Sequence, residues 1–207
     1  MHAALVTFTL ALGLGLNTVA FSSVNALVFR PFAVPGSESF GWVFIGSPRD
    51  PQASSDTRTF DALRDSATTL DAIGAEGRVA LTGESPAGPE QVWALAVSPD
   101  YFSVVTPPMR LGRPLSRADV TDGTIPILIS ERYWASRFGR SDDLTTIRPV
   151  LNGQLTAVLG VVRDDYQGPG GIFEPHVWVP FDGLPVLQAG PGRGGPRHRT
   201  AHGHRVP

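Results

Sequence analysis

The chain has 207 residues and a formal net charge of −2 at pH 7, which gives no indication of a nucleic-acid partner. It contains no cysteine, and this excludes a disulfide framework, a thiolate nucleophile and a cysteine-based metal site. Beyond an uncharged segment at the start, the remaining length corresponds to one globular domain of ordinary size.

The uncharged segment covers residues 3–29. As an α-helix it would extend roughly 40 Å at about 1.5 Å per residue, which exceeds the ~30 Å hydrocarbon core of a bilayer. The sequence therefore predicts a transmembrane helix at 3–29. A secretory signal peptide is the alternative, because residues 18–20 and 24–26 are compatible with cleavage. The run is longer than the apolar part of a signal peptide, roughly 7–15 residues, and no Lys or Arg precedes it, which favours a retained anchor.

Small and weakly polar residues recur along one face of this expected helix: they are Ala11, Gly15, Thr18, Ser22 and Asn25. Their steps of four and three residues keep them within a narrow sector at about 100° per residue. Such a stripe lets another transmembrane helix approach closely. Gly, Ser and Thr are also simply frequent in membrane helices, and this alternative stays open. We predict that this face packs against other transmembrane helices.

After residue 29, strand and helix patterns mix without regular alternation. Strands are predicted at 40–45, 78–82, 92–97, 125–129, 149–151, 156–162 and 177–179, and helices at 59–73, at 98–102 with Ser98 as the N-cap, and at 130–138 with Ser130 as the N-cap. Asn152-Gly153 is the strongest hairpin signal in the chain. The mixture predicts an α+β domain at 30–188. Residues 189–207 are dense in Gly, Pro, Arg and His and are expected to be disordered.

No catalytic, cofactor-binding or metal-binding residue is predicted. The chain lacks the G-x-x-x-x-G-K-[ST] phosphate loop, so ATP hydrolysis is expected in another protein. Asp164 and Asp165 could be paired acids or metal ligands, but adjacent acids after a strand usually form a solvated turn. His176 is expected to be structural, and the tail histidines, at 198, 202 and 204, to bind metal only incidentally. An extracytoplasmic hydrolase lacks a nucleophile and a base, so we predict a non-enzymatic protein.

Several segments together resemble a known family. Residues 11–31 resemble the first transmembrane helix of FtsX-like ABC transporter permeases. Shorter segments then follow in the order seen in the MacB-like periplasmic core domain: they are 81–83, 89–92, 97–102, 111–113, 133–134, 137–139, 151–153, 158–161 and 176–180.

This resemblance implies a permease subunit of the bacterial inner membrane with its domain at 30–188 outside the cytoplasm. Members pair with a cytoplasmic ABC ATPase that drives export or release of a substrate, and in efflux pumps the domain also contacts a periplasmic adaptor. The helix face at 11–25 would then pack against helices of a permease subunit or of a second copy.

Two departures from the family concern residues 143–149, which lack its usual Gly-bearing connection, and the tail at 189–207, where the family continues with three more transmembrane helices. A truncated member is therefore expected. The alternative function is a secreted binding or adaptor module whose first helix is removed as a signal peptide.

Overall fold

The computed structural model describes residues 2–28, 40–41, 43, 57–119, 124–166, 168–169, 173–189 and 200–205. The chain divides into two compact units, residues 1–32 and residues 33–207. Of the strand predicted at 40–45, only residues 40, 41 and 43 lie within the described part.

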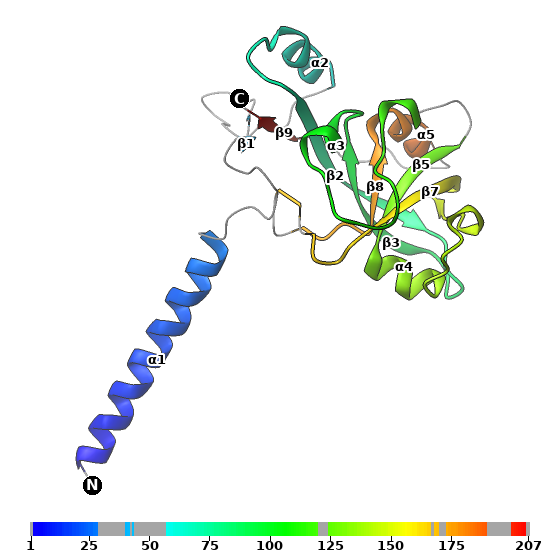
Figure 1. Ribbon diagram of the computed structural model, residues 1–207. Coiled ribbons are helices and arrows are strands. Elements are labelled where there is room, and N and C mark those ends of the chain that lie inside the picture. Colours follow the sequence, from blue (N-terminus) through cyan, green and yellow to red (C-terminus); the bar gives the residue numbers. More distant parts are fainter. Residues whose placement is uncertain are drawn as a thin grey trace. The chain divides into compact units, whose positions relative to one another are not determined.

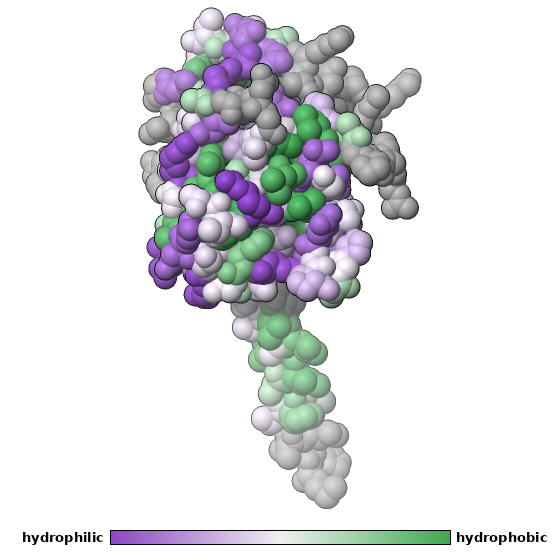
Figure 2. Space-filling model, turned by 90° about the vertical axis from the view of Figure 1, so that its right-hand side faces the viewer, coloured by the Kyte–Doolittle hydropathy of each residue, from purple (hydrophilic) through white to green (hydrophobic). Residues whose placement is uncertain are grey.

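The first unit contains one helix, α1 (His2–Val28), which agrees in extent with the helix predicted at 3–29. Its described side chains are exposed and mainly apolar (Figure 2). The hydroxyl of Thr18 donates a hydrogen bond to the Leu14 carbonyl at 2.8 Å, so this polar group is satisfied within its own helix. Among the residues described, no helix combines the length and the apolar character needed to cross a membrane. The transmembrane role predicted for 3–29 is therefore not confirmed.

The second unit is built on a mixed sheet (Figure 1). Its described strands are β1 (Phe40–Gly41), β2 (Ile73–Gly83), β3 (Glu90–Val97), β4 (Met109–Gly112), β5 (Ile125–Ser130), β6 (Val150–Leu151), β7 (Gln154–Val162), β8 (Val177–Pro180) and β9 (Thr200–Arg205). They are ordered β1-β9-β2-β3-β8-β5-β7-β4, and β6 pairs with both β2 and β7. The β3–β8 and β5–β7 pairs are parallel and the others are antiparallel. The domain is therefore a mixture of sheet and helix, as the irregular sequence pattern predicted.

The described helices of this unit are α2 (Thr57–Ser66), α3 (Tyr101–Val104), α4 (Glu131–Phe138) and α5 (Leu184–Gln188). The helix predicted at 59–73 ends at Ser66, because Ile73 is the first residue of β2 and pairs with β9. Ser130 accepts a hydrogen bond from the Tyr133 main-chain N–H at 3.1 Å, and this confirms it as the N-cap of α4. Ser98 is not the N-cap of α3, because its hydroxyl accepts a bond from the Ala75 N–H at 3.0 Å on β2.

The hairpin predicted at Asn152-Gly153 is confirmed and connects β6 to β7. Asn152 has φ of 50° and Gly153 has φ of 76°. Positive φ at both central residues is the geometry that a two-residue hairpin turn of type I′ requires, and Asn and Gly adopt it with the least strain.

The strand β9 lies in the tail that the sequence predicted to be disordered at 189–207, and the structure differs from that prediction at these six residues. It pairs with β2 on one side and with β1 on the other. Strand pairing uses backbone N–H and C=O groups, so it does not require the large apolar side chains that this tail lacks. Residues 190–199 and 206–207 lie outside the described part of the chain.

The hydrophobic core lies on both faces of the sheet. On β5, Ile127 and Ile129 pack in one cluster of buried side chains, and Leu128 packs in a second cluster. On β8, Val177 and Val179 join the first cluster, and Trp178 joins the second. Alternate residues of a strand point to opposite faces, and a strand covered on both faces therefore reads as a continuous apolar run. This arrangement places Trp178 in the layer that contains the pockets.

Candidate functional site

Two adjoining pockets share Tyr166, Pro175 and Trp178. We call them the aromatic pocket, which also includes Glu76 and Arg78, and the charged pocket, which also includes Arg132 and Asp164. Their volumes are about 20 Å³ and about 60 Å³, respectively.

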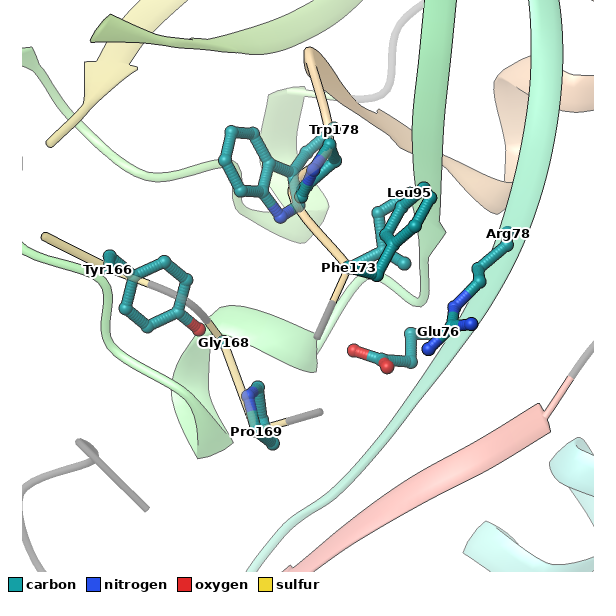
Figure 3. A pocket seen from close by; sticks show the side chains of 9 residues that line it. Glu76, Arg78, Leu95, Tyr166, Gly168, Pro169, Phe173 and Trp178 are labelled. Atoms are coloured by element: carbon teal, nitrogen blue, oxygen red, sulfur yellow. The ribbon is translucent and has the colours of Figure 1, made fainter. Parts of the chain in front are cut away.

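A buried carboxyl group is the main polar feature of the aromatic pocket (Figure 3). Glu76 of β2 is 8 % exposed, and the Tyr101 hydroxyl donates a hydrogen bond to its Oε2 at 2.5 Å. Burial raises the pKa of Glu76, while the bond from Tyr101 and the charge of Arg78 act in the opposite direction. Burial and the charge of Glu76 raise the pKa of Tyr101. The pair therefore holds a proton in the interior at the junction of β2 and α3.

Two further polar groups face this pocket. The Trp178 Nε1 makes no hydrogen bond with any described residue, and the Tyr166 hydroxyl makes only a weak contact with the Tyr101 hydroxyl, outside ordinary hydrogen-bond geometry. Tyr166 is 9 % exposed and Trp178 is 3 % exposed. Burial, followed by the charge of Glu76, raises the pKa of Tyr166, so its phenol is neutral and retains its proton. The indole nitrogen, the phenol oxygen and the Glu76 carboxyl face the same space (Figure 3).

The rim of the aromatic pocket is formed by Phe173 and Arg78. The Arg78 guanidinium carbon lies 4.8 Å from the centroid of the Phe173 ring, which is a cation–π contact. On the other side, Phe173 meets the ring of Trp93 edge-on at 6.2 Å. Trp93 is 42 % exposed, so this aromatic group reaches the surface.

The charged pocket contains ionised side chains that are already paired. Arg132 contacts Glu174 at 2.6 Å, and Arg163 contacts Asp165 at 2.7 Å. Asp164 accepts a hydrogen bond from the Arg132 main-chain N–H at 2.8 Å, at the positive N-terminal end of α4. The two neighbouring acids thus have separate structural partners in an exposed turn, as the sequence analysis expected. Within the described ranges, no group of three His, Asp or Glu side chains could hold a metal ion.

His176 connects β3, β8 and α4. The Trp93 main-chain N–H donates a hydrogen bond to its Nδ1 at 3.2 Å, and its ring stacks on Tyr133 with a 5.5 Å centroid separation. Burial, followed by the charges of Arg132 and Arg137, lowers the pKa of His176. The imidazole is therefore neutral near pH 7 and acts as a hydrogen-bond acceptor, which supports the structural role expected for it.

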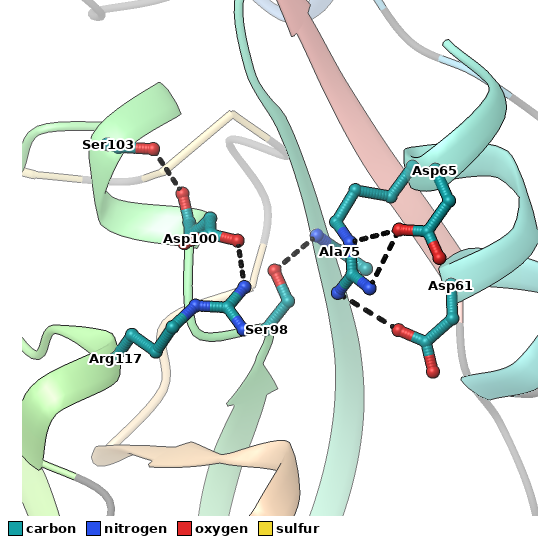
Figure 4. A network of polar contacts seen from close by, with 8 residues as sticks. Asp61, Asp65, Ala75, Ser98, Asp100, Ser103 and Arg117 are labelled. Atoms are coloured by element: carbon teal, nitrogen blue, oxygen red, sulfur yellow. Dashed lines mark hydrogen bonds and ion pairs between the residues drawn. The ribbon is translucent and has the colours of Figure 1, made fainter.

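Other polar contacts lie within or between elements of the domain (Figure 4). Arg117 donates to the Asp100 carboxylate at 2.5 Å, and Arg64 contacts Asp61 at 3.0 Å. These groups are largely exposed, and exposed ion pairs contribute little to stability. The Ser98 hydroxyl bonded to the Ala75 N–H, in contrast, is buried and joins β2 to the end of β3.

The predicted helix-packing residues all lie in α1. The side chains of Ala11, Thr18 and Ser22 are exposed, and a Cβ added at Gly15 would have open space around it. Asn25 belongs to α1, but its side chain lies outside the described part. Packing of this face against other helices stays a prediction. The side chains of the tail histidines, at 198, 202 and 204, also lie outside the described part.

The sequence analysis missed the aromatic pocket. Glu76, Tyr166 and Trp178 come from β2, from the turn after β7 and from β8, and no sequence spacing relates them. The one signal for this pocket in the sequence was Glu76, an acidic residue in the otherwise apolar first part of β2.

The fold has close counterparts among solved structures. The extracellular domain of the noncanonical ABC-type transporter YknZ from Gram-positive bacteria matches with a TM-score of 0.59 and 16 % identity, over 80 % of this chain and 81 % of that one. The periplasmic region of MacB from Actinobacillus actinomycetemcomitans matches with a TM-score of 0.58 and 14 % identity, over 81 % of this chain and 74 % of that one. At these identities the likeness concerns the fold.

The sequence of residues 3–200 matches the family model of the MacB-like periplasmic core domain. No functionally curated protein matches the chain. The family match covers most of the chain, and the two similar structures share its fold. The chain therefore belongs to the MacB-like periplasmic core domain family.

Proposed function

We propose that this chain is the membrane-anchored extracytoplasmic part of an FtsX-like permease subunit in the bacterial inner membrane. The observation that carries the proposal is the exposure of α1. The large apolar side chains of α1 that the structure describes are 55 % to 71 % exposed: they are Phe8, Leu10, Leu12, Leu14, Leu16, Val19 and Phe21. Burying each such side chain is worth about 1.5–3 kcal/mol, and a bilayer would supply that burial.

The domain, in this proposal, couples a separate cytoplasmic ATPase to export or release of a substrate and catalyses no reaction itself. Strands β3, β5 and β8 are buried in the centre of the sheet, which makes the domain suited to transmit displacement as a unit. The ionised side chains of the charged pocket are paired with one another, which agrees with a mechanical role. A periplasmic adaptor is a further proposed partner.

Because the chain has no cysteine, single-cysteine variants test the anchor directly. Leu14→Cys is placed in α1, and Leu155→Cys is placed at an exposed position of β7. In spheroplasts, a membrane-impermeant maleimide should label Leu155→Cys but not Leu14→Cys, which should react only after the membrane is dissolved in detergent and denatured. The cysteine-free chain is the blank. Equal labelling of both variants in spheroplasts would contradict the anchor.

N-terminal sequencing of the mature protein separates this function from the secreted module. A retained residue 1 or 2 together with recovery in the membrane fraction supports the anchor. A mature start near Phe21 or Leu27 and recovery in the soluble periplasmic fraction would favour the secreted alternative.

The proposed packing face of α1 has a matched control in Gly13, which lies off the stripe. A Cβ meets no neighbour within 4 Å at either Gly13 or Gly15, so neither substitution to leucine should disturb the isolated helix. Gly15→Leu should reduce the size of the complex extracted from membranes with mild detergent, because it blocks close helix approach, whereas Gly13→Leu should not. Complexes of equal size for the two variants would contradict the proposal that this face packs against other helices.

A further inference from the structure

We propose that the aromatic pocket is a binding site for one neutral hydroxyl group, which accepts hydrogen bonds from Trp178 and Tyr166 and donates one to Glu76. The site is independent of the transport function. It concerns only the second unit of the chain and holds whether or not α1 anchors the protein.

The donors of the site are the first argument. Trp178 Nε1–H can only donate, and Tyr166 O–H is neutral and can also donate. Both side chains are more than nine-tenths buried. Trp178 has no partner among the described residues, and the Tyr166 hydroxyl has only its weak contact with the Tyr101 hydroxyl. A buried donor without an acceptor of ordinary geometry is destabilising, so two of them facing one space indicate that an acceptor binds there.

The charge of the site selects the kind of acceptor. An anion would add a second negative charge beside the Glu76 carboxylate, at a buried position where even one charge is disfavoured. An ammonium group has no lone pair and could not accept from Trp178 or Tyr166. A hydroxyl group fits both requirements, because its oxygen accepts two hydrogen bonds and its proton can be donated to the Glu76 carboxylate.

The size of the pocket limits the occupant to one such group. A volume of about 20 Å³ is enough for a single water-sized group. Of its rim residues, Arg78 is exposed and Phe173 is half-buried, so the hydroxyl group can enter from the surface. The hydroxyl can therefore come from a water molecule or from an alcohol carried by a larger molecule whose remainder stays outside.

The indole N–H signal of Trp178 reports directly on the occupant. In the full-length chain labelled with ¹⁵N-tryptophan in detergent micelles, we expect a cross-peak between this N–H and a bound hydroxyl proton. Trp134 is the internal control, because its Nε1–H donates to the Ser141 carbonyl at 2.9 Å and should show no such cross-peak. Methanol is the probe for the source: it should shift the Trp178 signal saturably if alcohols enter, and it should leave the water cross-peak unchanged if the site takes water alone.

Thermal unfolding of Tyr166→Phe gives a second readout whose sign is decisive. If a hydroxyl is bound, the variant loses one hydrogen bond, and the Tm should fall by about 2–4 °C. If nothing is bound, the variant removes a buried hydroxyl whose one contact is the weak one with Tyr101, and the Tm should change by less than 2 °C or rise. Tyr101→Phe is the positive control, since it removes a hydrogen bond that the structure contains. Absence of the Trp178 cross-peak together with an unchanged or higher Tm of Tyr166→Phe would overturn the proposal.

Discussion

Replacing Asn152 with alanine should destabilise the domain through three separate losses. The Asn152 side-chain oxygen accepts a hydrogen bond from the Thr82 N–H at 2.7 Å, and its side-chain nitrogen donates to the Leu187 carbonyl at 2.9 Å. The hairpin thereby connects to β2 and to α5. The third loss is conformational, because the residue has φ of 50°, where alanine is strained.

The magnitude follows from these three contributions. Each hydrogen bond contributes about 1 kcal/mol net, and a left-handed conformation costs a residue with a Cβ about 1 kcal/mol. The free energy of unfolding should therefore fall by about 3 kcal/mol. For a chain of this size, that corresponds to a Tm lower by roughly 6–12 °C.

Two matched variants separate the contributions in thermal unfolding followed by circular dichroism. Asn152→Gly removes both hydrogen bonds without the strain and should lose about 2 kcal/mol. Asn152→Asp keeps the acceptor for the Thr82 N–H but replaces the donor to the Leu187 carbonyl by a second acceptor, so its loss measures that contact. A Tm of Asn152→Ala within 2 °C of the unmodified chain, about the change expected for less than 1 kcal/mol, would refute the reasoning.

Three further outcomes are expected. Glu76→Gln should gain stability over the unmodified chain at pH 7 but not at pH 4. The raised pKa of the Glu76 carboxyl makes the stability of the unmodified chain fall as the pH rises above the ordinary carboxyl pKa of 4.5, whereas the amide of the variant stays neutral and its oxygen can still accept from Tyr101. Urea midpoints at the two pH values test this. Because the pKa of His176 is lowered, stability should fall as the pH decreases below about 6.5, where protonation of Nδ1 removes the hydrogen bond from the Trp93 N–H. The variant His176→Asn should show a weaker pH dependence in the same urea series. Ser130→Ala should cost about 1 kcal/mol with an unchanged urea m-value, because only the cap of α4 is lost.

The sequence could predict features that depend on a few neighbouring residues. Asn152-Gly153 specified its turn because both residues tolerate positive φ, and Ser130 specified the start of α4 because its hydroxyl reaches the free N–H of Tyr133. The apolar run at 125–129 likewise predicted a strand. These properties are local, so any tertiary arrangement that contains the segment preserves them.

Where local preference competes with distant partners, the sequence pattern was insufficient. Ser98 has the residue type of an N-cap, but its hydroxyl bonds to β2 instead. The periodicity of 59–73 continues to Ile73, but pairing with β9 makes that residue a strand. The six tail residues of β9 carry no pattern that could be distinguished from disorder.

By itself, the sequence determined the extent of α1, the hairpin, the mixed character of the domain and the family to which it belongs. Only the tertiary structure decided that Glu76, Tyr166 and Trp178 face one cavity and that the Trp178 Nε1 is buried there without a partner among the described residues. The physical reason is that a backbone conformation depends on a few adjacent side chains, whereas burial and hydrogen-bond pairing depend on which distant strands become neighbours. In this chain the parallel pairing of β3 with β8 brings Leu95 beside Trp178 and thereby forms the wall of the pocket.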